Sequence, residues 1–178
     1  MSYSSRRALA VPAIVALTSL AVTIPASAVA GGPVVRAAGP LSDLQPAVAG
    51  PLDGAAAAVQ IVASARGSHA VLRVRGIEGA DGTTFGAHLH VGPCVAGNGA
   101  AALGHYNTDV LAGSSEPEIS EDTEVWLDLE VHHGGGTATA SVPFVPAPGT
   151  RSVVIHALPT DHHTGAAGAR LACLPVVW

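Results

Sequence analysis

The stretch Ala58-Val-Gln-Ile-Val-Ala63, a turn at Arg66-Gly67 and the stretch Ala70-Val-Leu-Arg-Val-Arg75 decide the fold of this 178-residue chain. The first run alternates loosely and the second clearly between apolar and polar side chains. This period of two is typical of a half-buried β-strand. The two runs with the glycine between them therefore predict β-strands joined by a turn.

Similar short runs continue to the end of the chain and are separated by turns rich in glycine and proline. They are Thr83 to Val91, Glu124 to Val131, Thr137 to Phe144, Ser152 to Ala157 and Arg170 to Val177. No segment shows convincing helical periodicity. Many short strands with such turns predict an all-β domain, an antiparallel β-sandwich or flattened barrel. The segment 92–123 is too long for an idle connection and is expected to be a functional loop.

The N-terminal segment resembles a secretory signal peptide over residues 1–28. Arg6 and Arg7 precede the apolar run Ala8 to Ile24, and Ala26-Ser-Ala28 offers small residues for cleavage. A membrane anchor is the alternative, but two prolines interrupt the run and no later segment is long and apolar enough to span a membrane. We therefore expect a chain that is secreted, extracellular or held in the cell envelope.

The remaining chain is expected to form a leader and one domain. Residues 29–54 are rich in proline, alanine and glycine and predict a flexible leader, with at most one edge strand near Val34-Val-Arg36. Residues 55–178 form the predicted β domain. After residue 28 the chain has thirteen acidic residues and six arginines, a net charge near −7 with histidine neutral. This charge argues against nucleic acid or an anionic membrane as a partner.

The candidate site is the stretch Phe85-Gly-Ala-His88-Leu-His90-Val-Gly-Pro-Cys94. Residues two apart on a strand point to the same face, so His88 and His90 present two imidazoles side by side. Neutral imidazole is a common ligand for copper and zinc. His105 and His156 lie where they could join this pair, although a histidine that ends a strand, such as His156, also fits a hydrogen-bonded structural role. An oxidising compartment favours a disulfide between Cys94 and Cys173, and two buried free thiols are the alternative.

Four motifs carry a resemblance to a known family. They are His88-Leu-His90, Gly104-His105-Tyr106-Asn107, Val153-Val-Ile-His156 and Gly165-Ala-Ala-Gly-Ala-Arg170-Leu-Ala-Cys173. In this order they resemble the motifs of the secreted copper–zinc superoxide dismutases, and more closely those of their bacterial copper-only members. The resemblance covers roughly residues 57–177 and implies a Greek-key β-sandwich or flattened barrel.

The resemblance also implies roles for individual residues. The implied copper ligands are His88, His90, His105 and His156, and the implied disulfide joins Cys94 to Cys173. Arg170 is expected beside the copper, where a permanent positive charge would attract a small anion; the alternative is a solvated surface arginine. His105 matches the family's bridging histidine and is expected to carry a proton during turnover.

The chain departs from the family at the zinc site, which in the family uses two further histidines and an aspartate after the bridging histidine. Residues 106–131 contain no histidine. The acids considered as ligands there are Asp109, Glu116, Glu118, Glu121, Asp122, Glu124 and Asp128. Carboxylates alone make an uncommon structural zinc site, so we expect copper and no zinc. Asp128 is either a remnant of the zinc aspartate or an inward or solvated strand acid, and the group that replaces zinc beside His105 is not predicted.

Other polar residues have weaker assignments. Asp161 falls near the family's aspartate that braces a copper-ligand imidazole, with a plain loop acid as the alternative. The pairs His132-His133 and His162-His163 are expected to be solvated loop residues, and His69 has no assigned role. The interval between His90 and Cys94 is shorter than in the family, a region that often makes dimer contacts, so a homodimer is left open.

These observations predict an exported copper-dependent superoxide dismutase that converts superoxide to oxygen and hydrogen peroxide. The alternative is a secreted copper-binding module that carries the metal without efficient turnover. Arg170 separates the two, because a metal carrier has no need of a charge that guides an anion.

Overall fold

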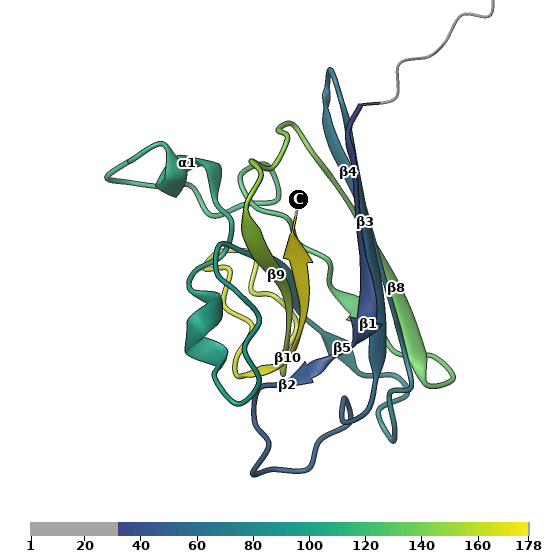
Figure 1. Cartoon of the computed structure of the whole chain (residues 1–178). Helices are drawn as coiled ribbons and strands as arrows, with labels where there is room; N and C mark the ends of the chain where they lie inside the picture. Colours follow the sequence, from purple (N-terminus) through teal and green to yellow (C-terminus); the bar gives the residue numbers. More distant parts are fainter. Residues whose placement is uncertain (1–31, 178) are drawn as a thin grey trace, which may run out of the picture.

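The computed structural model describes residues 32–177, so the predicted signal peptide lies outside the described residues. These described residues form two four-stranded antiparallel sheets that pack face to face (Figure 1). The first sheet has the order β1 (Val34–Pro40), β3 (Ala56–Ser64), β4 (Gly67–Arg75) and β8 (Gly135–Val142). The second has the order β2 (Ser42–Asp43), β10 (Arg170–Val177), β9 (Thr150–His156) and β6 (Ala87–His90). The prediction of an all-β sandwich is confirmed.

The alternating runs of the sequence produce the core between the two sheets. In β3 and β4 every second side chain is buried, and the two strands pair along their whole length from Ala56↔Arg75 to Ser64↔Gly67. The apolar side chains of both sheets form one cluster that includes Val59, Ile61, Leu72, Val74, Leu89, Val153, Ile155, Leu174 and Val176. Inner faces that interdigitate in this way are what hold a β-sandwich together.

The predicted boundary at residue 55 is wrong, because the strand β1 lies inside the segment expected to be a flexible leader. β1 pairs with β3 from Val34↔Val62 to Pro40↔Ala56. It is an edge strand, where a proline does not remove a hydrogen bond from the middle of a sheet. Val35, Leu44 and Leu52 of the same segment are buried. The domain therefore begins before residue 55, and the edge strand expected near Val34 is longer than predicted.

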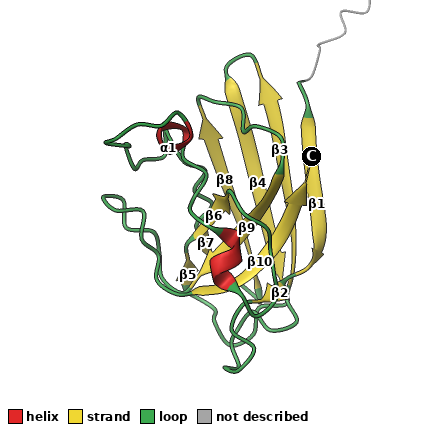
Figure 2. Cartoon of the chain, turned by 60° about the vertical axis from the view of Figure 1, so that its left-hand side comes forward, coloured by secondary structure: helices red, strands yellow, loops and turns green. Residues whose placement is uncertain are grey.

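The connection between β6 and β8 contains little regular structure. It includes the short helices η1 (Gly99–Ala102) and α1 (Thr108–Leu111), followed by β7 (Leu129–Glu130), which pairs with β5 (Thr84–Phe85). The two helices lie on the side of the β9–β10 sheet, away from β1, β3, β4 and β8 (Figures 1 and 2). Within residues 32–177 no helix is long and apolar enough to cross a membrane.

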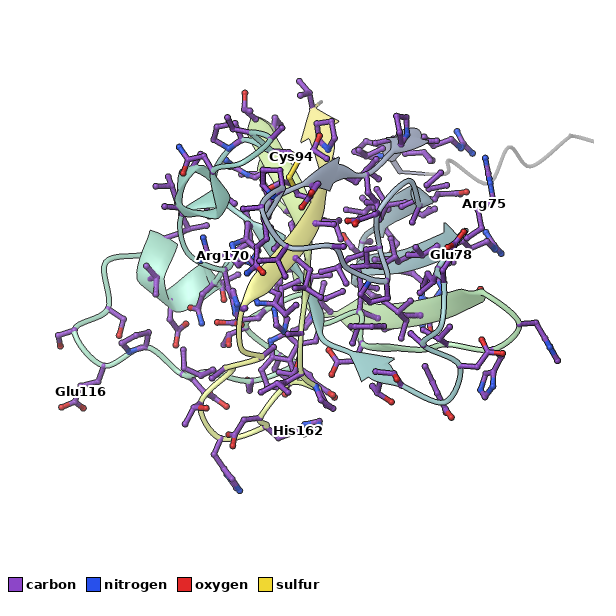
Figure 3. All side chains as sticks on the ribbon, turned by 90° about the horizontal axis from the view of Figure 1, so that it is seen from below. Arg75, Glu78, Cys94, Glu116, His162 and Arg170 are labelled. Atoms are coloured by element: carbon purple, nitrogen blue, oxygen red, sulfur yellow. A yellow bond between two sulfur atoms is a disulfide. The ribbon has the colours of Figure 1, made fainter. Side chains whose placement is uncertain are left out.

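A disulfide fixes the start of this connection. Cys94 is bonded to Cys173 of β10, with 5.6 Å between their Cα atoms, and the bond is visible beside the yellow strand in Figure 3. The predicted pairing is confirmed, and the alternative of two free thiols is excluded. Cys173 is fully buried in a small cluster with Leu44, Ala102 and Val154. The disulfide therefore holds the segment that carries η1 against the second sheet.

Candidate metal centre

Four histidines from three parts of the chain meet at one end of the second sheet. His88 and His90 lie on β6, and His156 is the last residue of the neighbouring strand β9. His105 is held beside them because it forms an isolated antiparallel bridge with His90. One ring nitrogen of each histidine lies within 4.8 Å of those of the other three. The structure therefore brings together all four histidines predicted as ligands, in an arrangement that could hold a metal ion.

Burial keeps His88, His90 and His156 uncharged when no metal is bound. His88 and His90 are 0% exposed and His156 is 4% exposed. Burial lowers the pKa of His90 to about 3 and that of His156 to about 4, and it lowers the pKa of His88 as well. The nearby charges of His105 and Arg170 act in the same direction on all three. At neutral pH the three rings are therefore neutral imidazoles, the form that binds metal ions.

Backbone carbonyls fix which nitrogen of two rings faces the cluster. Nδ1 of His90 lies 3.1 Å from the carbonyl oxygen of Leu103, and Nδ1 of His156 lies 3.3 Å from that of Gly168. A carbonyl oxygen only accepts, so each Nδ1 carries the proton and each Nε2 has a free lone pair. The two Nε2 atoms lie 3.3 Å apart. Two lone pairs at this distance repel each other, and a bound cation would turn the repulsion into coordination.

His88 presents its other nitrogen to the cluster. Nε2 of His88 lies 2.7 Å from Oγ1 of Thr160, whereas its Nδ1 is buried without a hydrogen-bond partner. The ring centroids of His105 and His156 lie 4.0 and 4.9 Å from that of His88. A buried nitrogen without a partner is costly unless something binds it. The residues present therefore fit a metal ion, with Nδ1 of His88 and Nε2 of His90 and His156 as ligands.

Glu124 faces the fourth histidine. Its Oε2 accepts hydrogen bonds from Nδ1 of His105 at 2.7 Å and from the indole nitrogen of Trp126 at 2.8 Å. Its Oε1 accepts one from the side-chain amide of Asn107 at 3.0 Å. Burial acts to raise the pKa of Glu124, but the bonds from His105, Trp126 and Asn107 outweigh it and lower that pKa. An ionised Glu124 only accepts, so Nδ1 of His105 carries the proton and its Nε2 is left to face the cluster.

His105 is the most accessible member of the cluster. Its side chain is 19% exposed, whereas that of its partner Glu124 is 3% exposed. Gly165 approaches the pair closely, with φ of +69° and an ideal Cβ position 2.8 Å from Ile119 and 3.7 Å from Nδ1 of His105. A larger residue at position 165 would be strained and would crowd the His105–Glu124 contact. Because the side chain of His105 is partly exposed, solvent reaches the cluster on the side of His105.

Arg170 is the first residue of β10 (Figure 3). It pairs with His156 of β9. Its guanidinium donates hydrogen bonds to the carbonyl oxygens of Gly99 at 2.6 Å and of Leu103 at 2.5 Å. The side chain is half-buried, and burial lowers the pKa of the guanidinium from its ordinary value. Leu103 has φ of +59°, which is uncommon for a leucine, and its carbonyl oxygen serves both Arg170 and His90. A positive charge is thus held next to the cluster by the loop that also orients His90.

The other predicted residues lie outside the cluster. Asp161 is exposed and accepts hydrogen bonds from the backbone nitrogens of His163 and Thr164, so it has the role of a loop acid and does not brace a ligand imidazole. Asp128 is half-buried and binds Thr160. The side chains of His132 and His162 are 66% and 71% exposed, as expected for loop residues.

The sequence did not single out three residues that contact the ligands. Thr160 lies in a loop 72 residues from His88 in the sequence, and only the folded structure brings the two side chains into contact. Glu124 is one of several acids in its segment, and the sequence assigns no role to Trp126. The sequence does offer a signal for Glu124 and Trp126, because residues two apart in an extended segment share a face.

Comparisons with protein-family models and with curated proteins gave no match to this chain. The family resemblance therefore rests on the four motifs.

Proposed function

We propose that this protein is an exported copper-dependent superoxide dismutase of the copper-only type. The observation that supports this proposal best is the asymmetry of the cluster. Three ligands are buried, oriented by the fold and near the charge of Arg170, whereas His105 is partly exposed and bound to Glu124. A storage site needs the three fixed ligands but not the exposed histidine or the positive charge.

Copper suits a set of four imidazole nitrogens, which bind both its oxidation states. His88, His90, His105 and His156 would hold it. When bound, copper supplies one-electron redox chemistry, in which one superoxide is oxidised to oxygen and a second is reduced to hydrogen peroxide with two protons. In place of a zinc ion, the chain has the buried carboxylate of Glu124 beside Nδ1 of His105.

His105 is the residue placed to deliver one of those protons. Its Nδ1 donates to Glu124, so a proton taken up at Nε2 would create an imidazolium whose charge the carboxylate stabilises at 2.7 Å. The exposed edge of His105 gives that proton a route from solvent. Glu124 and Trp126 keep the ring in place while the proton moves.

Arg170 supplies the attraction for the substrate. The chain after residue 28 carries a net charge near −7, so superoxide is repelled by the protein as a whole. Arg170 stays protonated at any relevant pH and offers a local positive charge next to the ligands. Its two bonds to backbone carbonyls hold the guanidinium in one place.

The test is superoxide clearance by copper-loaded protein in a xanthine oxidase assay, with bound copper measured on the same sample. We expect fast clearance by the wild type, loss of clearance and of tight copper binding in His156→Ala, and neither loss in the matched control His132→Ala at an exposed histidine. Tight copper binding with clearance no faster than the blank would overturn the dismutase and favour the copper carrier.

A further inference from the structure

A hydroxyl group lies between a carboxylate and the ligand His88. Oγ1 of Thr160 is 2.7 Å from Nε2 of His88 and 2.6 Å from Oδ1 of Asp128. Thr160 is 5% exposed and sits in the loop that follows β9. Asp128 lies on the segment that leads into β7 and is separated from Thr160 by 32 residues. Three parts of the chain therefore meet in one line of hydrogen bonds that ends at the metal-binding cluster.

The donors around Asp128 set the direction of this line. The backbone nitrogen of Thr160 donates to Oδ2 at 2.8 Å, and that of Ala87 donates to Oδ1 at 3.3 Å. Because a carboxylate only accepts, the hydroxyl proton of Thr160 points to Asp128 and its oxygen is left to accept from His88. Nε2 of His88 must then carry the ring proton. Nδ1, the buried nitrogen without a partner, is left with its lone pair.

We infer that Thr160 and Asp128 are positioning residues that hold His88 in the tautomer whose Nδ1 binds the metal. The inference rests on the proposed metal site but not on dismutase turnover. His90 and His156 are oriented by backbone carbonyls and do not need this device. His88 is the one cluster member whose orienting contact is a neutral hydroxyl, which can donate as well as accept. Asp128 accepts the hydroxyl proton of Thr160, so the hydroxyl oxygen is left to accept the hydrogen bond from His88.

The loop acid next to Thr160 has no part in this line. Asp161 accepts from the backbone of His163 and Thr164 and is exposed. Thr160 donates two hydrogen bonds to Asp128, one from its backbone nitrogen and one from its hydroxyl. Thr160→Val removes the hydroxyl, keeps the shape of the side chain and leaves the backbone bond that anchors the loop. This variant therefore separates the orientation of His88 from the folding of the loop.

The first measurement is the tautomer of His88 in the metal-free protein, read from long-range proton–nitrogen NMR spectra. We expect protonation at Nε2 in the wild type and in Thr160→Ser. In Thr160→Val we expect a mixture or a change to Nδ1, because the buried Nε2–H loses its acceptor. The matched control is Thr139→Val at an exposed position of β8, with no change expected. An unchanged tautomer in Thr160→Val would overturn the inference.

The second measurement is copper affinity by competition with a chelator, together with the electron paramagnetic resonance spectrum of the cupric protein. Loss of a contact that orients a ligand typically weakens metal binding about 10–100-fold. We expect that loss and an altered spectrum in Thr160→Val and in Asp128→Asn, with Asp161→Asn as the unchanged control. Affinity and spectrum of Thr160→Val equal to those of the wild type would contradict the inference.

The outcome for the function is separate. If the wild type binds copper but clears no superoxide, the proposed dismutase function is wrong. The comparison of tautomer and copper affinity between the variants still decides the role of Thr160. If the wild type binds no copper, the proposed metal site is wrong and so is the inference that rests on it.

Discussion

Nδ1 of His105 donates a hydrogen bond of 2.7 Å to Oε2 of Glu124, a carboxylate whose side chain is only 3% exposed. In the family that the sequence resembles, a zinc ion is expected beside this nitrogen. Here the carboxylate, with Trp126 and Asn107 as further donors, fills that place. We propose that Glu124 performs the orienting role of the missing zinc.

Glu124→Gln removes the charge that faces His105 and places an amide NH₂ among three donors. Because at least one of these donors then loses its acceptor, we expect the rate of superoxide clearance to fall about 10–100-fold. Clearance per bound copper, measured between pH 6 and 9, checks this. Glu121→Gln changes an exposed acid, 70% accessible, and serves as the control. Equal clearance in both variants would contradict the role of Glu124.

Arg170→Ala removes the positive charge beside the cluster. We expect kcat/KM for superoxide to fall at least about 10-fold at low ionic strength, with bound copper unchanged, and the deficit to shrink as salt screens the attraction. Arg66→Ala removes the same charge from an exposed turn between β3 and β4 and should have little effect. An Arg170→Ala protein as fast as the wild type at low salt would exclude guidance by this residue.

The Cys94–Cys173 disulfide closes a loop with a sequence separation of 79 residues. The chain-entropy model gives about 4.5 kcal/mol of stabilisation for such a loop. We expect Cys94→Ser/Cys173→Ser to lower the free energy of unfolding by about this amount in urea titrations of the metal-free protein. A decrease below about 1 kcal/mol would mean that the second sheet holds the η1 segment without the bond.

The metal-free protein should lose stability as the pH falls below 6.5. The folded-state pKa values of His90 and His156 are lowered to about 3 and about 4, so between these values and 6.5 the unfolded chain binds protons that the folded one does not. From pH 7 to pH 5 each of these histidines then costs about 2 kcal/mol of unfolding free energy. Denaturant titrations at both pH values check this, and His90→Gln should show a correspondingly smaller loss. A wild type equally stable at both would refute it.

The fold was predictable where strands alternate or are uniformly apolar. The run Arg170 to Val177 corresponds to β10, and Ala70-Val-Leu-Arg-Val-Arg75 lies within β4. The length of strand β1 was underestimated because Gly39 and Pro40 are unfavourable in a central strand but tolerated at an edge. Glu124 to Val131 was predicted as one strand, but only Leu129–Glu130 pairs regularly. The rest of that segment turns its polar residues towards His105 and Thr160.

The ligands were predictable and their partners were not. His88 and His90 share a strand face, and the four histidines sit in recognisable motifs. Thr160 and Asp128 are 72 and 40 residues from His88 in sequence, and a hydroxyl or a carboxylate in a loop has many ordinary explanations. Only the packing of the β9–β10 loop against the segment before β7 shows that these side chains meet. Contacts that orient a ligand thus depend on tertiary structure in a way that the ligands' own spacing does not.

The carbonyl oxygen of Leu103, shared by His90 and Arg170, belongs to a loop whose start is tied down by Cys94. In a chain whose cysteines are still reduced, the bond that fixes the start of this loop is absent. His90 and Arg170 would then both lose the fixed position of the carbonyl oxygen that orients them. We therefore expect oxidation of Cys94 and Cys173 to be needed before His90 and Arg170 take up these positions. A copper ion that reaches the reduced chain would meet the histidine side chains before the site that orients them is complete.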